Sequence, residues 1–189
     1  MRKTFKIIIA VFAAIIILVV ALGAIVFLDV AAYTATGSQM LSPTGTSVGK
    51  AIVLYDAGLS GTSKTVASQI ATDLQAQNYI VTLAGVKSSP ASNTTGYSVI
   101  VIGGPVYAGS LTGSVKDALN NLVLSHDQGA KIGIFRSGQG ATSPDDVAQI
   151  KQSIPARSDN SLSEAVVVKI GSSEDLSTRT QDFINQLLS

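Results

Sequence analysis

Two glycine-rich stretches hold the residues whose types and spacing could do chemistry. The first, DAGLSGTSKT at 56–65, combines small residues with the hydroxyl groups of Ser60, Thr62 and Ser63. Small residues let a backbone wrap a phosphate, and hydroxyl and N–H groups at a helix N-terminus bind it without a lysine. The stretch therefore indicates a phosphate site. A Ser/Thr N-cap in an ordinary strand-to-helix turn is the alternative interpretation.

The second stretch reads GGPVYAGS at 103–110 and follows an apolar run. Paired glycines let a chain leave a sheet close to a ligand, and Pro105 stiffens that exit. Tyr107 has a flat face that can stack on an aromatic ring system; the alternative is a half-buried tyrosine with its hydroxyl in water. A third stretch, RSGQGATS at 136–143, is also rich in glycine.

The elements that must position these stretches alternate between strand and helix. Apolar runs typical of strands occur at 51–55, 79–83, 98–102, 131–135 and 165–170, and helical spacing occurs at 62–77, 114–124, 144–154 and 176–188. Continuous apolar strands indicate burial on both faces. The pattern predicts an α/β fold, an open five-stranded parallel sheet of order 2-1-3-4-5 with helices on both faces. Ligands bind such sheets at the carboxyl ends of the strands.

An apolar segment precedes this pattern. Residues 7–28 carry no charge, and about 20 apolar residues are enough to cross a bilayer as a helix. Arg2, Lys3 and Lys6 lie before the segment, so the positive-inside bias predicts a cytoplasmic N-terminus. We therefore expect a single-pass membrane protein whose domain lies on the extracytoplasmic side. A cleaved signal peptide remains an alternative, because alanine-rich residues follow.

The chain divides into three parts on this interpretation. Residues 1–29 form the N-terminal transmembrane anchor. Residues 30–49 are small, polar and without a period, which predicts a flexible linker. Residues 50–189 form the folded domain. The formal net charge of the whole chain is only +1, which argues against a nucleic-acid partner, and the lack of cysteine excludes disulfides and thiol chemistry.

Other constellations fit different chemistry less well. GLSGTSKT at 58–65 nearly matches a nucleotide-binding P-loop, but Ser63 replaces its second glycine. Asp145 and Asp146 follow Ser143 and Pro144, which predicts a helix start rather than a metal site. The single histidine, His126, falls in a polar stretch and is interpreted as a surface turn residue.

Two segments together resemble the flavodoxin-like superfamily. They read IVLYDAGLSGTSKTVASQIATDL at 52–74 and YSVIVIGGPVYAGSLTGSVKDAL at 97–119. The phosphate loop of flavodoxins reads roughly T/S-x-T/S-G-x-T/S, and the segment after their third strand reads G-S/T-P-V/I-Y-x-G. The second loop is most similar to flavodoxin domains related to menaquinone-dependent protoporphyrinogen oxidase, which also carry G-P-V-Y-A-G. Gly58 departs from the family, because a hydroxyl residue usually stands there.

The resemblance implies an FMN-binding electron-transfer domain tethered to the membrane, of the FMN-dependent oxidoreductase type. It would exchange electrons with an unknown redox protein or a membrane electron donor or acceptor. The flavin carries the chemistry, so no catalytic side chain or metal is expected. The alternative is a degenerate flavodoxin-fold binding or scaffold module without flavin. The cofactor-binding residues implied are Leu59, Ser60, Gly61, Thr62, Ser63, Pro105, Val106, Tyr107, Ala108, Gly109, Ser137, Gly138, Gln139 and Gly140.

Overall fold

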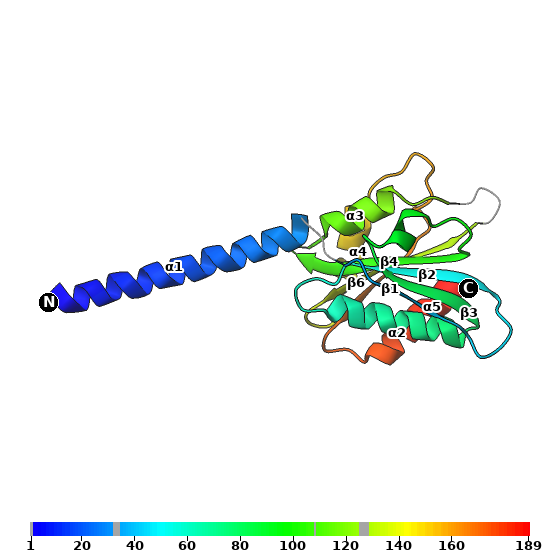
Figure 1. The fold of residues 1–189 in the computed structure, drawn as a ribbon, viewed down its shortest axis with the longest axis horizontal. Coiled ribbons are helices and arrows are strands. Elements are labelled where there is room, and N and C mark those ends of the chain that lie inside the picture. Colours follow the sequence, from blue (N-terminus) through cyan, green and yellow to red (C-terminus); the bar gives the residue numbers. More distant parts are fainter. Residues whose placement is uncertain (1, 32–34, 108, 125–128) are drawn as a thin grey trace.

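Strands and helices alternate along the chain after a long N-terminal helix (Figure 1). The computed structural model describes residues 2–31, 35–107, 109–124 and 129–189, and in the first range it describes the side chains of residues 7–27. The elements in chain order are α1 (Arg2–Ala31), β1 (Ser38–Leu41), β2 (Gly49–Tyr55), α2 (Thr62–Ala76), β3 (Tyr79–Gly85), the 3-10 helix η1 (Ser89–Ser92), β4 (Val99–Tyr107), β5 (Ser110–Leu111), α3 (Gly113–Asn120), β6 (Lys131–Gly138), α4 (Pro144–Ser153), β7 (Val166–Gly171) and α5 (Leu176–Leu188).

The sheet has the strand order β1-β3-β2-β4-β6-β7, and β5 pairs with β4. Strands β3, β2, β4, β6 and β7 are parallel to one another, in the order predicted for a five-stranded sheet. The prediction of only five strands is wrong, because β1 and β5 add antiparallel pairings to β3 and β4. Strand β1 supplies partners for backbone groups at the edge of β3 that would otherwise lie unpaired.

Strand β1 also changes the interpretation of residues 30–49. Their composition predicts a flexible linker, but residues 38–41 form a strand that pairs with β3. Ser38 lies opposite Ala84, and Leu41 lies opposite Val81. Pairing at a sheet edge is made by backbone groups, so it needs no apolar alternation in the sequence. Leu41 adds a side-chain contact, because it packs against the buried core.

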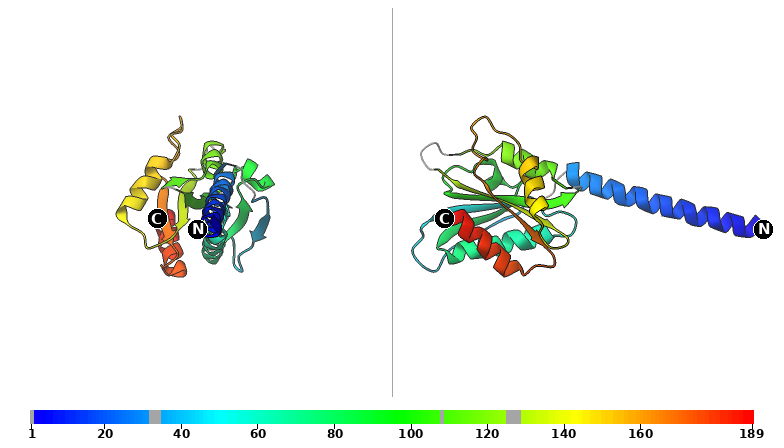
Figure 2. Two further views of the ribbon diagram at one scale, coloured as in Figure 1. Left: turned by 90° about the vertical axis from the view of Figure 1, so that its left-hand side faces the viewer. Right: turned by 180° about the vertical axis from the view of Figure 1, so that it is seen from behind.

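Helices cover the sheet on both faces, as predicted. Figure 1 shows α3 and α4 on one face and α2 and α5 on the other, and Figure 2 shows the same layers from two further sides. Alternate strand residues enter the two cores, so successive residues such as Val53 and Leu54 are both buried. The helices contribute Val66, Ile70, Leu74, Phe183 and Ile184 to one core and Val115, Leu119 and Ile150 to the other.

Strand β4 is longer than the sequence predicts, and this changes the role of the paired glycines. Both glycines lie inside β4 and are buried, rather than at its exit from the sheet. A Cβ atom on Gly103 would lie 2.2 Å from the carbonyl oxygen of Phe135, and one on Gly104 would lie 2.9 Å from Val115 Cγ2. These glycines therefore permit close packing against β6 and α3.

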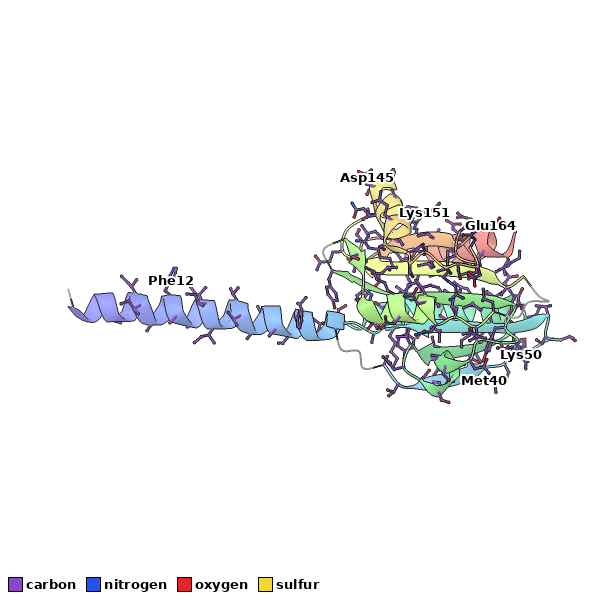
Figure 3. All side chains as sticks on the ribbon, turned by 90° about the horizontal axis from the view of Figure 1, so that it is seen from above. Phe12, Met40, Lys50, Asp145, Lys151 and Glu164 are labelled. Atoms are coloured by element: carbon purple, nitrogen blue, oxygen red, sulfur yellow. The ribbon has the colours of Figure 1, made fainter. Side chains whose placement is uncertain are left out.

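Helix α1 stands away from the domain (Figures 1 and 3). In the described part of the chain it is the one helix long and apolar enough to cross a membrane, over Ile7–Phe27, and its side chains in that range are not covered by protein. Phe12, for example, points outward and is 66% exposed. The helix has the length and composition of a single-pass anchor, and equally those of a signal sequence.

The buried position of Gly103 gives a first prediction. Gly103→Ala should lower the free energy of unfolding by about 1–3 kcal/mol, because the new methyl group overlaps backbone that cannot move away cheaply. Gly129→Ala is the matched control, since no described atom lies within 4 Å of a Cβ built there. Denaturant unfolding of both variants measures the effect; equal stabilities would contradict this account of the glycine pair.

Candidate functional site

A cleft of about 370 Å³ lies at the carboxyl ends of the parallel strands, where the three glycine-rich stretches meet. Its size is in the range of about 300–1,000 Å³ that small-molecule sites occupy. The first loop contributes Leu59, Ser60 and Thr62. The second loop contributes Pro105, Val106 and Tyr107, the third contributes Ser137, Gly138 and Gln139, and Ser172 is the residue just after β7. The loops that the sequence singled out thus converge on one cavity.

The first loop leads directly into helix α2. The N-cap position is Gly61, which has no side chain to cap the helix, so the interpretation of the loop as a Ser/Thr N-cap is wrong. Ser60 Oγ instead donates a hydrogen bond to Thr62 Oγ1, at 2.9 Å. Both hydroxyl groups line the cleft, at the end of α2 where the first N–H groups have no partner within the helix.

Ser63 lies deeper than its neighbours. It is 1% exposed, and its hydroxyl lies 2.6 Å from the hydroxyl of Ser137, which is also buried. This hydrogen bond joins the first loop to the third. The two hydroxyl groups are hydrogen-bonded to each other. That Ser63 and Ser137 bind a cofactor stays a prediction.

Gly58 departs from the flavodoxin pattern for a packing reason. Its φ is +62°, and a Cβ atom there would lie 2.7 Å from Pro105 Cγ. A side chain at this position would therefore be strained and would also push the first and second loops apart. The loss of one hydroxyl allows the two loops to pack closely.

Asp56 is the buried anchor of the first loop. It is 2% exposed, and its carboxylate accepts hydrogen bonds from the Gly58 N–H at 3.2 Å, from Thr112 Oγ1 at 2.8 Å and from Ser114 Oγ. These contacts tie the first loop to the start of α3. The sequence analysis did not single out Asp56; the signal was an acid immediately after a buried strand, where a carboxylate needs several donors.

The second loop places Tyr107 in the lining of the cleft. Tyr107 pairs with Ser110 in the β4–β5 hairpin, and its hydroxyl oxygen lies 3.4 Å from the Leu59 N–H that donates to it. The side chain thus reaches from the second loop to the first. Gly109 has a φ of +81° in this turn. Ala108, also implied as a binding residue, lies outside the described residues.

The third loop lies against the end of β7. Gly138 and Gln139 line the cleft, whereas Gly140 lies beside Gly171, whose absent side chain leaves room for the Gly140 carbonyl. Ser172 joins the lining, and its N–H donates to the Gly138 carbonyl at 3.0 Å. Sequence reasoning missed Ser172, although every residue just after a parallel strand lies at this edge of the sheet.

Partly buried polar and ionic contacts hold the third loop. Lys169 Nζ lies 2.9 Å from Asp146 Oδ2 and also donates to the Ala141 carbonyl at 3.0 Å. Ser143 and Asp146 form a capping box at the start of α4, which confirms the predicted helix start. The hydrogen bond from Lys169, with those from Ser143, holds the pKa of Asp146 well below its usual range.

Arg136 adds a second buried cation beside this pair. It is 7% exposed, and its Nε and Nη1 atoms make no hydrogen bond to any described residue. Burial lowers the pKa of the guanidinium, and the nearby carboxylate of Asp146 acts in the opposite direction. Arg136, Lys169 and Asp146 therefore place three charged groups close together beside the third loop.

The fold of this chain is similar to that of solved flavodoxin structures. The chain is similar to oxidised Flavodoxin 2 from Bacillus cereus, with a TM-score of 0.52 and 20% identity over 74% of this chain and 97% of that one. It is also similar to a flavodoxin, WrbA-like protein from Agrobacterium tumefaciens (TM-score 0.50, 13% identity, 74% and 96% coverage). An NADH:FMN oxidoreductase (EMOB) in its apo form gives a TM-score of 0.52 at 14% identity, with 74% and 88% coverage.

These similarities define the class of the fold. The chain has a flavodoxin-like fold preceded by an apolar helix. No protein-family model matches the chain, and no curated protein matches it in sequence. At identities this low the similarity establishes the fold alone, so the ligand has to be argued from the cleft.

The contacts of Asp56 give a second prediction. Asp56→Ala should cost about 1–3 kcal/mol of stability, because Thr112, Ser114 and the Gly58 N–H would lose a buried acceptor. Asp117→Ala, an exposed acid on α3, is the control and should change stability by less than about 0.5 kcal/mol. Thermal unfolding of the two variants compares them, and an unchanged Asp56→Ala protein would show that the carboxylate does not hold the loop.

Proposed function

We propose that this protein is a membrane-tethered, FMN-binding domain that transfers electrons. The observation that carries the proposal is the single cleft in which a hydroxyl-rich helix start, a tyrosine-bearing loop and a glycine-rich loop meet at the carboxyl ends of β2, β4 and β6. Flavodoxin-like sheets bind FMN at this switch point. The similarity of this chain's fold to that of a flavodoxin supports the proposal of FMN as the ligand.

The residues of the first loop suit the phosphate group. Ser60 and Thr62 present hydroxyl groups at the start of α2, where N–H groups and the helix dipole favour an anion. The cradle needs no lysine, because hydrogen-bond donors and the dipole supply the attraction. Gly58 and Gly61 keep this turn small, so a phosphate oxygen could approach the backbone closely.

The other two loops suit the flavin ring. Tyr107 offers an aromatic face, Val106 an apolar one, and the third loop adds the backbone of Gly138 and Gln139 to the lining of the cleft. FMN, when bound, supplies the electron-transfer chemistry. The chain's own part is to orient the ring, exclude water from one side of it and present backbone donors to its polar edge.

The apolar helix suits a retained anchor. Its uncharged segment is longer than the roughly 7 to 15 residues of a signal-peptide core, and the basic residues before it favour a cytoplasmic N-terminus. The domain would then lie on the extracytoplasmic side, with a redox protein or a membrane electron carrier as its partner. The closer relationship to flavodoxin domains of the menaquinone-dependent protoporphyrinogen oxidase type is proposed on the G-P-V-Y-A-G loop.

A scaffold or binding module without flavin is the second candidate. It is favoured by two features of the phosphate loop, the glycine at 58 and the engagement of the Ser63 hydroxyl with Ser137. Both reduce the number of hydroxyl donors left for a phosphate. The flavin absorbance of the purified full-length protein, before and after incubation with excess FMN, decides between the two candidates.

The phosphate cradle gives a third prediction. Thr62→Glu should reduce FMN retention more than about tenfold, equivalent to about 1.4 kcal/mol, because a carboxylate would repel the phosphate. Thr72→Glu makes the same change at an exposed position on α2 and should bind FMN normally. Titration of each apoprotein with FMN gives the two Kd values. Equal Kd values would remove this loop from the site.

The ring contact gives a fourth prediction. Tyr107→Ala should weaken FMN binding by about 1–3 kcal/mol, the scale of aromatic stacking on a base, and should brighten the fluorescence of bound FMN. Tyr107→Phe keeps the ring and removes the hydroxyl that accepts a hydrogen bond from the Leu59 N–H, so quenching should persist. Steady-state flavin fluorescence separates the variants, and equal brightness in all three proteins would show that Tyr107 does not stack on the ring.

A further inference from the structure

The segment that joins α1 to the domain enters the sheet at the edge that holds the cleft. Strand β1 is antiparallel to β3, and its first residue, Ser38, lies opposite Ala84, at the carboxyl end of β3. The chain therefore arrives from α1 at the carboxyl ends of the parallel strands. It then runs toward their amino ends before β2 begins.

Two backbone hydrogen bonds hold this entry point in place. The Gly85 N–H donates to the Gly37 carbonyl at 2.9 Å, and the Lys87 N–H donates to the Ala35 carbonyl at 3.2 Å. A Cβ atom on Gly85 would lie only 2.2 Å from the Ala35 carbonyl oxygen. Residues 35–37 are thus part of the folded domain, and Gly85 allows them to lie against β3.

The entry point is also close to the first loop of the cleft. Gly85 lies opposite Tyr55 in the sheet, and the Val86 N–H donates to the Tyr55 carbonyl at 3.1 Å. The first loop begins at the next residue, Asp56. Neighbouring strands lie about 4.8 Å apart, so Ala35 and the start of the first loop are separated by about two such spacings, or 10 Å.

Little chain separates this point from the apolar helix. Helix α1 ends at Ala31 and the described domain resumes at Ala35. Four residue steps reach at most about 14 Å, so the Cα atoms of these two residues lie no farther apart than that. Helix α1 also comes close to α3. Figure 1 shows α1 meeting the domain beside α3, and Figure 3 shows Lys50, at the start of β2, at the end of the domain farthest from α1.

We propose that the carboxyl edge of the sheet, with its cleft, faces the membrane surface. This inference rests on the proposed role of α1 as a retained anchor. The short connection and the pinned β1 strand leave the domain little freedom to turn its cleft away from the bilayer. A redox group carried in the same membrane can reach the cleft, whereas a soluble protein would first have to enter the gap between domain and lipid.

The absence of cysteine from the chain allows a direct test. Leu59→Cys, at the rim of the cleft, and Val48→Cys, before the start of β2, each give the full-length protein one thiol for a fluorescent label. Both native side chains are exposed, at 53% and 65%. The two labels lie at opposite ends of the parallel strands, Val48 at the amino ends and Leu59 at the carboxyl ends. The seven-residue strand β2 separates these ends by about 20 Å.

The labelled proteins are reconstituted into phosphatidylcholine vesicles that carry a quencher on the lipid headgroup. The Leu59 label should be quenched severalfold more than the Val48 label. Equal quenching, or stronger quenching at Val48, in protein that floats with the vesicles after an alkaline wash would overturn the inference and leave the anchor intact. Protein that does not float would overturn the anchor, and with it the inference. Flavin absorbance of unlabelled protein reports the cofactor independently.

Two further variants test the cause. A flexible Gly/Ser segment of about ten residues, inserted between Ala31 and Ala35, keeps β1 on the sheet but frees the domain from the bilayer, so the difference between the labels should shrink. Gly85→Ala should have the same effect by displacing Ala35, while Gly37→Ala should not, since no described atom lies within 4 Å of its Cβ position. A difference that survives the insertion would contradict the role of the short connection.

Discussion

Parallel pairing of β2 with β3 and β4 is the constraint on which the rest of the structure depends. Parallel strands place all of their carboxyl ends at one edge, and each chain segment that leaves there must turn back over a face of the sheet. The first and second loops leave on either side of the point where the strand order reverses. The cleft is therefore a product of topology, and the side chains at Ser60, Thr62 and Tyr107 give it chemical character.

The loops that line the cleft are held in place by contacts with neighbouring segments. Asp56 accepts hydrogen bonds from the start of α3, Pro105 leaves no room for a side chain at Gly58, and the Ser63 hydroxyl lies 2.6 Å from that of Ser137. Each contact joins two loops that are distant in sequence. Such an arrangement keeps the walls of the cleft in place, so that binding would not have to order them first.

The connection to α1 shows how a small secondary element can determine where a chain enters a domain. Strand β1 has four residues, yet it commits the chain to enter the sheet at its carboxyl edge. A flexible linker of the same length would let the domain rotate freely relative to α1. With β1 paired, the surface that carries the cleft and the surface nearest the apolar helix are the same.

Local patterns in the sequence by itself determined the positions of most strands, helices and cleft loops. Apolar runs and helical spacing located the five parallel strands and the covering helices, with α5 at its observed bounds and α3 ending earlier than expected. Glycine and hydroxyl residues after those strands located the three loops. These signals are readable because a strand buried on both faces and a helix buried on one each impose a period on the chain.

Only the tertiary structure decided the features that rest on contacts between distant segments. Strand β1 forms because the edge of β3 offers backbone partners, which leaves no mark in its own composition. The burial of Ser63, the hydrogen bonds of Asp56 and the place of Ser172 in the cleft depend on which loops become neighbours. The glycines at 103 and 104 likewise serve packing against Phe135 and Val115, because a close approach between elements is set by the fold and not by the local sequence.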